Sequence, residues 1–329
     1  MASLVSVVIP AYNAAEFIGR SIASLRQQTL TDMEILVVDD ASTDATVATV
    51  KALMATNSDI RLLEQPQNGG VAVARNTGIA QAQGRYIAFL DADDVFLPQR
   101  LEVLVQQAEA HQLDVVGDNQ VMHDVHLGRG VGVVDFNPTD HLQLLTARAF
   151  LEGSHNVPTW REILSGSRAA YFPIIKPIIR RDFLTRHALR YDPACSIGED
   201  FDLHIRCLLE GAKFGLVPQA LYVYTLPYSV YSSTRSPNTR TRFNLQPVLD
   251  NVDQLLTRYA DTLDPDVRQA LIRCKDGSRG LEQFEEFKRA LYRKRPQAVL
   301  SLVTTPGLWQ YVARSTTTKL RNLSARRFA

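Results

Sequence analysis

Three carboxylates within four positions follow an apolar stretch, and their types and spacing suit chemistry at a ligand. The stretch reads RYIAFLDADD, and its acids are Asp91, Asp93 and Asp94. Like charges this close repel one another, and each costs solvation free energy if it is partly buried. A cation or a set of hydrogen-bond donors is therefore expected beside them. Mg²⁺ and Mn²⁺ prefer such carboxylate oxygens and usually keep substrate phosphates and water as their other ligands.

Two further polar clusters follow predicted strands earlier in the chain. Tyr12 and Asn13 come after the apolar run 5–10, and Asp39 and Asp40 come after the run 34–38. In parallel sheets ligands bind at the carboxyl ends of the strands. We therefore expect the three clusters to share one edge of a sheet and to form one site.

Alternating strands and helices must position these residues. Continuous apolar strands separated by amphipathic helices predict an α/β fold, with a mostly parallel, Rossmann-like central sheet and helices on both faces. Strands are expected at 5–10, 34–38, 61–63 and 86–90, and helices at 15–28, 44–58 and 71–81. The second half is less regular, with strand-like pieces at 113–116, 176–179 and 221–224, a helix at 199–210 and helical periodicity over 244–300.

A nucleotide diphosphate suits the expected edge. Tyr12 can stack on a base, Asn13 or Asp40 can pair with its polar edge, and two carboxylates can share a ribose hydroxyl and a cation. The sequence has no GxGxxG and no GxxxxGK[ST] loop to hold phosphates. A metal ion held by carboxylates would supply the missing positive charge.

Four segments, taken in order, resemble a known enzyme family. VSVVIPAYN, EILVVDDASTDAT, NGGVAVARNTGIAQAQGRYIAFLDADD and GEDFDL resemble the inverting glycosyltransferases of family 2, which have the GT-A fold. The match covers about residues 3–225. The segment KPIIRRDFLTRHALRYDPACSIGEDFDL is most similar to bacterial exopolysaccharide enzymes of the succinoglycan type. The resemblance implies a GT-A domain at 1–225, then a lid loop, a helical extension and a basic tail at 226–329.

The resemblance also implies roles for individual residues. It places donor contacts at Pro10, Tyr12, Asn13, Asp40, Arg75 and Asp91, a ligand for Mg²⁺ or Mn²⁺ at Asp93, and the catalytic base at Asp200. Inverting transfer needs one base that takes the proton of the acceptor hydroxyl. Partial burial and the neighbouring Glu199 are expected to raise the pKa of Asp200 for this task. The cation would assist departure of the diphosphate.

One segment departs from the family pattern. In many relatives, the loop after the strand at 221–224 carries a basic residue and a histidine that help to hold the diphosphate. The corresponding segment here, YTLPYSVYSSTR, contains no histidine. Arg235 or Lys176 could replace it, and the loop is expected to close over the donor.

Purely structural roles remain open for several of these acids. Asp39 and Asp40 could form a turn that caps the next helix. Asp94 could satisfy backbone N–H groups, and Glu199 and Asp200 could be acids favoured by a helix dipole.

Charge is distributed unevenly along the chain. The 329 residues carry a net charge of +1, yet the first 286 hold 26 basic and 35 acidic residues, a net charge of −9. After Glu286 there are ten basic residues and no acid: Lys288, Arg289, Arg293, Lys294, Arg295, Arg314, Lys319, Arg321, Arg326 and Arg327. Such a tail is expected to meet an anionic membrane surface. Because it lacks interleaved aromatic residues and the body is acidic, a nucleic acid partner is not expected.

The cysteine content favours a reducing cytoplasm, and the resemblance together with the basic tail implies a peripheral enzyme on the inner face of a bacterial plasma membrane. Three scattered cysteines give no disulfide framework or zinc motif, and no signal peptide or membrane-spanning stretch is evident. The expected reaction moves a hexose from a nucleotide sugar, such as UDP-glucose or another UDP-hexose, to a lipid-linked saccharide. A sugar-phosphate nucleotidyltransferase and a non-catalytic nucleotide-binding protein are the alternatives. The N-terminus lacks the Gly-rich basic loop of the former.

Overall fold

A computed structural model describes residues 3–125, 128–154, 175–195, 197–226, 245–292, 309–310 and 312–313. The chain divides into two compact units, Met1–Ala147 with Phe172–Arg240, and Arg148–Tyr171 with Thr241–Ala329. The domain boundary expected at residue 225 remains a prediction.

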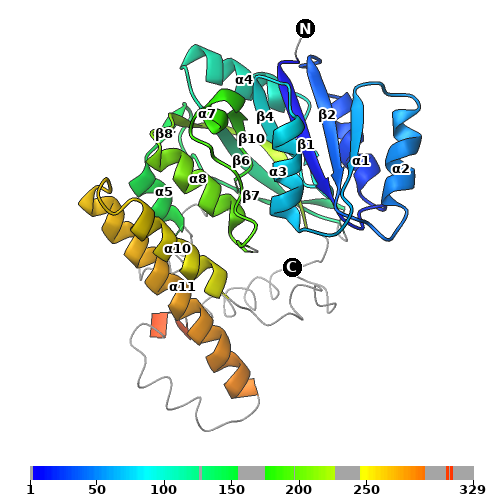
Figure 1. Ribbon diagram of the computed structural model, residues 1–329. Helices are drawn as coiled ribbons and strands as arrows, with labels where there is room; N and C mark the ends of the chain where they lie inside the picture. Colours follow the sequence, from blue (N-terminus) through cyan, green and yellow to red (C-terminus); the bar gives the residue numbers. More distant parts are fainter. Residues whose placement is uncertain are drawn as a thin grey trace, which may run out of the picture. The chain divides into compact units, whose positions relative to one another are not determined.

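A mixed sheet is the centre of the first unit (Figure 1). Within the described residues its strands are β1 (Val5–Ala11), β2 (Met33–Asp39), β3 (Ile60–Glu64), β4 (Tyr86–Phe89), β5 (Val95–Phe96), β6 (Val115–Asp124), β7 (Arg129–Val134), β8 (Gln143–Leu145), β9 (Ile178–Arg180) and β10 (Phe214–Leu226). Their order is β3-β2-β1-β4-β9-β6-β10-β5, with β7 on β6 and β8 on β10. Strands β1, β2, β3, β4, β6 and β10 run in one direction, and the other four run against them.

Helices cover both faces of this sheet, as the sequence predicts. Among its described residues, the first unit has the helices α1 (Ile18–Arg26), α2 (Thr46–Met54), α3 (Val71–Gln81), α4 (Arg100–Ala110), α7 (Arg181–Arg186) and α8 (Glu199–Leu209). Apolar residues of α1, α2 and α4 share one core with alternate residues of β1 and β2. Helix α3 packs on the opposite face, where Gly78 lies against Val8. Because β1 is buried along its whole length, its sequence shows no polar alternation.

The sheet is less uniform than the sequence indicates beyond β4. The extended piece expected at 176–179 becomes β9, which runs antiparallel between β4 and β6. Strand β10 extends from Phe214 to Leu226, so the four residues expected at 221–224 are only its end. Register shifts interrupt its pairing with β6 between Val217 and Tyr222, where Pro218 interrupts the apolar run.

The second unit is helical where the structure describes it. It contains α10 (Gln246–Arg258) and α11 (Pro265–Tyr292), which pack together (Figure 1), and most of α5 (Ala147–Ser154). Leu249, Val252 and Leu255 form the buried stripe of α10. Among the described residues, the chain has no helix with the length and apolarity that a membrane span requires.

Candidate active site

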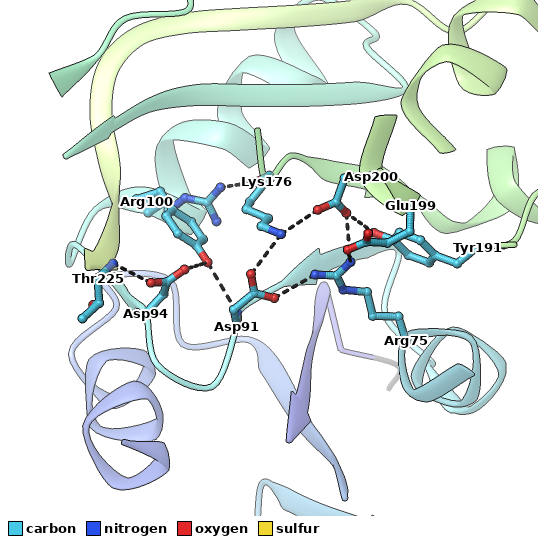
Figure 2. Close-up of polar contacts among 10 residues, drawn as sticks. Arg75, Asp91, Asp94, Arg100, Lys176, Tyr191, Glu199, Asp200 and Thr225 are labelled. Carbon is cyan, nitrogen blue, oxygen red and sulfur yellow. Dashed lines mark hydrogen bonds and ion pairs between the residues drawn. The ribbon is translucent and has the colours of Figure 1, made fainter. Parts of the chain in front are cut away.

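Four charged side chains form a closed ring at the carboxyl edge of the sheet (Figure 2). Asp91 forms ion pairs with two cations: its Oδ1 lies 2.8 Å from Arg75 Nη2, and its Oδ2 lies 2.9 Å from Lys176 Nζ. Asp200 pairs with the same two cations: its Oδ1 lies 3.0 Å from Arg75 Nη1, and its Oδ2 lies 2.7 Å from Lys176 Nζ. We call these four residues the ion-pair ring. It joins the acid after β4 to the acid at the start of α8.

Two further side chains complete the surroundings of the ring. Glu199 contacts the same guanidinium nitrogen of Arg75 as Asp200 does, at 3.0 Å. The Tyr191 hydroxyl donates to Asp200 Oδ1 at 3.1 Å, and its ring lies 5.0 Å from the Arg75 guanidinium carbon. The Arg75 side chain is only 2% exposed, whereas that of Asp91 is 25% exposed. The ring is therefore open to a ligand on its Asp91 side.

Two helix starts position the ring members. Asp40 accepts hydrogen bonds from the backbone N–H groups of Gly69 and Gly70, both at 2.8 Å. Gly70 has φ of +85°, which glycine adopts without strain, and α3 begins directly after it and carries Arg75. Gly198 has φ of +83° and precedes α8, whose first two residues are Glu199 and Asp200.

The charges of the ring fix the ionisation of its members. Burial would raise the pKa of Asp91, but Lys176 and Arg75 outweigh it and leave the pKa lowered. Burial likewise opposes ionisation of Asp200, and the same two cations again leave the pKa lowered. The pKa of Lys176 is raised, because Asp200 and Asp91 outweigh its burial. Each ring member is therefore charged at neutral pH.

This result corrects the expected electrostatics of Asp200. The sequence suggests that burial and Glu199 raise its pKa, whereas Arg75 and Lys176 lower it. Glu199 is the member of the pair whose pKa rises, because of its burial and of repulsion from Asp200. Two cations supplied by distant segments outweigh the effect of the adjacent residue.

The Asp93 carboxylate lies near Lys176 and Arg20, which favour its ionisation but do not form an ion pair with it. This carboxylate makes no ion pair within the described part of the chain, and burial together with Asp91 raises its pKa. A divalent cation would relieve both effects. The described residues contain no group of three ligating side chains, so such a cation would take further ligands from phosphate and water. Asp93 fits a metal that is bound together with a diphosphate.

Asp94 has a structural position. It is 1% exposed and accepts hydrogen bonds at 2.6 Å from the Tyr222 hydroxyl and from the Thr225 backbone N–H. The Asp91 N–H donates to the same Tyr222 oxygen at 3.4 Å. Asp94 therefore fastens the DADD turn to the end of β10.

The residues expected at the nucleotide base lie around the ends of β1 and β2. The Tyr12 side chain is exposed, whereas Pro10 is buried within β1. Asn13 Oδ1 accepts a hydrogen bond from the Thr43 N–H at 2.8 Å and so links the two turns. Both oxygens of Asp40 already hold the start of α3, which gives this acid a structural function in the fold.

The sequence profile described as Glycosyl transferase family 2 matches residues 6–172, which is just over half of the chain. The chain belongs to this family. It is a nucleotide-sugar glycosyltransferase, so the nucleotidyltransferase and the non-catalytic alternatives have no further support.

Two relatives of this family 2 glycosyltransferase are named for succinoglycan biosynthesis. It is 31% identical over 326 residues to the succinoglycan biosynthesis protein ExoO of Rhizobium meliloti (strain 1021), covering 98% of this chain and 87% of that protein. It is 33% identical over 220 residues to ExoU of the same strain, with coverage of 66% and 60%.

Solved structures agree with the GT-A fold of this glycosyltransferase. The S. aureus TarS 1–349 complex with UDP-GlcNAc matches with a TM-score of 0.59 and 24% identity, over 83% of this chain and 71% of that one. The mannosyltransferase PcManGT from Pyrobaculum calidifontis, in complex with GDP-Man and Mn²⁺, matches with a TM-score of 0.57 and 17% identity, over 98% and 88%.

Some site features of this glycosyltransferase were not evident from its sequence. Tyr191 lies in the segment RYDPACSIGED, and no sequence motif marks it as a partner of Asp200. Asp39 has a buried Oδ1 with no hydrogen-bond partner among the described residues, while its Oδ2 accepts from the Ser42 N–H at 3.0 Å. Lys176, considered for the diphosphate, lies in the ring. Arg235 falls outside the described residues.

Proposed function

We propose that this glycosyltransferase is an inverting, metal-dependent hexosyltransferase that uses a nucleotide sugar, most simply a UDP-hexose such as UDP-glucose. One observation carries the proposal: the ion-pair ring holds the ionised Asp200 beside Asp91, the acid expected at the donor. A proton acceptor is thereby fixed next to the donor site, as direct displacement requires.

Asp200 would act as the general base. The acceptor oxygen attacks the anomeric carbon, the bond from that carbon to the diphosphate oxygen breaks, and the acceptor proton passes to Asp200. The bond electrons leave with the nucleoside diphosphate. The lowered pKa of Asp200 keeps the carboxylate in the ionised form that can accept this proton. Tyr191, which donates to Oδ1, would hold the carboxylate in one orientation.

The donor would bind along the edge between the ends of β1, β2 and β4. Tyr12 offers an exposed ring for the nucleobase. Asp39 Oδ1, which is buried and has no hydrogen-bond partner among the described residues, would accept a hydrogen bond from an imide N–H of that nucleobase. Pro10, Asn13 and Asp40 would shape that end, and Asp91, held by Arg75, would face the ribose or the sugar. The UDP and UDP-GlcNAc complexes of TarS support a UDP donor.

Asp93 would hold Mg²⁺ or Mn²⁺ together with the diphosphate. The bound cation would supply Lewis-acid assistance to the leaving group. The Mn²⁺ in the PcManGT complex supports a divalent metal in this fold.

A lipid-linked saccharide would be the acceptor, in synthesis of an exopolysaccharide or another surface glycan. The similarity to ExoO and ExoU, both named for succinoglycan biosynthesis, supports this pathway class. The basic residues after Glu286 would bring the enzyme to the anionic inner face of the plasma membrane as a peripheral protein. Residues 1–225 would form the catalytic domain, and 226–329 would add the lid loop, helices and tail.

The proposal is tested with purified protein, Mn²⁺ and a panel of nucleotide sugars. Wild type should bind one donor selectively and hydrolyse it slowly, and should transfer the sugar when a saccharide acceptor is supplied. Asp200→Asn should bind that donor within about threefold of wild type and lose transfer by at least about 100-fold, as removal of a general base predicts. Product of retained anomeric configuration, or an active Asp200→Asn enzyme, would contradict the proposal.

A further inference from the structure

The Lys176 ammonium forms ion pairs with two carboxylates. Its nitrogen lies 2.7 Å from Asp200 Oδ2 and 2.9 Å from Asp91 Oδ2, and the side chain is only 7% exposed. An ammonium group has three N–H donors, so these contacts use two of them. Within the described part of the chain, Lys176 contacts Asp200 Oδ2, whereas Arg75 and Tyr191 both donate to Oδ1.

The backbone of Lys176 is fixed by a second, fully buried ion pair. Arg100 donates to the Lys176 carbonyl oxygen and pairs with Asp118 at 2.7 Å, and both side chains are at most 1% exposed. The Arg100 guanidinium also lies over the rings of Phe96 and Tyr222 (Figure 2 shows its contact with Lys176). If Arg100 moved, the buried Asp118 carboxylate would lose its counter-charge, so Arg100 and the backbone of Lys176 are held in place.

We propose that Lys176 is a positioning residue for transfer: it orients the Asp200 carboxylate and couples it to the donor-site acid Asp91, and it does not serve as a diphosphate ligand. This inference rests on the proposed function, in which Asp200 is the base. Without Lys176, Asp200 Oδ2 loses its cation, and Arg75 must compensate Asp91, Glu199 and Asp200 alone.

The two roles of Lys176 predict different kinetics. A positioning residue that acts through Asp200 should change kcat and leave UDP binding intact, whereas a diphosphate ligand should change the Kd of UDP. For Lys176→Met we expect kcat to fall by at least about 30-fold and the Kd for UDP with Mn²⁺ to change by less than about threefold. Lys51→Met, at an exposed residue of α2, is the matched control and should retain both values.

A double-mutant cycle tests whether Lys176 acts through Asp200. In an Asp200→Asn background, Lys176→Met should lower the residual transfer by less than about threefold, because the carboxylate that it orients is absent. A full additional loss, a wild-type kcat in folded Lys176→Met, or a loss confined to the Kd of UDP would each overturn the proposal. If wild type transfers no sugar from any donor, the proposed function fails and this inference falls with it.

Two further variants cover the case in which Lys176→Met does not fold. Lys176→Gln retains a hydrogen-bond donor without the charge and should show the same loss of kcat with intact UDP binding. Arg100→Lys leaves every charge of the ring in place and removes the guanidinium that fixes Lys176. It should lower kcat by at least about fivefold at an unchanged Kd for UDP. A folded Arg100→Lys enzyme with wild-type kcat would show that this anchoring is not needed.

Discussion

The three acids of the DADD turn have different surroundings. Asp91 is paired with two cations, Asp94 accepts hydrogen bonds from β10, and Asp93 has no ion pair within the described residues. A partly buried charge without an ion pair costs free energy unless a ligand compensates it. The three residues are therefore expected to respond differently to loss of charge.

Asp93→Asn should weaken the binding of UDP in the presence of Mn²⁺ by at least about tenfold, because the proposed metal loses its protein ligand. Isothermal titration with Mn²⁺ and with EDTA measures this directly. The difference between the two conditions should disappear in the variant.

Asp94→Asn is the informative comparison for that experiment. It should leave the metal dependence of UDP binding in place and lower the free energy of unfolding by about 1–3 kcal/mol, since it disturbs buried hydrogen bonds to Tyr222 and Thr225. Asp59→Asn, at a surface pair with Arg26, should change neither quantity appreciably. Equal Mn²⁺-dependent affinity in wild type and Asp93→Asn would exclude Asp93 as the ligand.

At the scale of elements, α8 is the helix in which the site and the core meet. Its first turn holds Glu199 and Asp200, and its next turn holds His204, which is 1% exposed and packs edge-on against Phe214. Burial lowers the pKa of His204 to about 4. The helix therefore contains a neutral imidazole one turn behind the proposed base.

This lowered pKa predicts a pH-dependent stability. Between about pH 6.5 and 4 the unfolded chain binds a proton at His204 that the folded protein does not, so stability falls as the pH falls. The His204 contribution over this window is about 3 kcal/mol. Urea unfolding at several pH values should show a smaller loss for His204→Gln than for wild type. His141→Gln, at an exposed histidine, should retain the wild-type slope, and an unchanged slope in His204→Gln would refute this account.

At the scale of the whole molecule, the acidic body and the basic C-terminal sequence have opposite charge. Deleting residues 312–329 removes five basic side chains, Arg314, Lys319, Arg321, Arg326 and Arg327. Each basic residue near an anionic leaflet contributes about 1 kcal/mol of binding free energy. The truncated protein should therefore be released from anionic vesicles at physiological salt, as measured by co-sedimentation.

A full-length variant with these five residues changed to Gln controls for the loss of chain length. It should be released like the truncation, because charge is the proposed cause. Neutral vesicles should bind none of the proteins. Undiminished sedimentation of the truncated protein with anionic vesicles would rule out the tail as the membrane contact.

The sequence by itself determined the order of strands and helices through β4 and the edge at which the site lies. Helix α3 occupies the predicted residues 71–81, and the apolar runs before the three polar clusters are the buried strands β1, β2 and β4. These features depend on local periodicity and on the apolar character of each run, which neighbouring residues determine. The family motifs lie in the same local segments, so they could be recognised from the sequence as well.

Only the tertiary structure decided how the charges are paired. Arg75 and Asp200 are 125 positions apart in the sequence. Lys176, which pairs with Asp91, comes just before the antiparallel strand β9. No spacing in the sequence therefore reveals the ring. The pKa of Asp200 was for this reason expected to rise and is instead lowered. Electrostatic energy depends on distance in space and on burial, and both arise when the sheet brings remote segments to one edge.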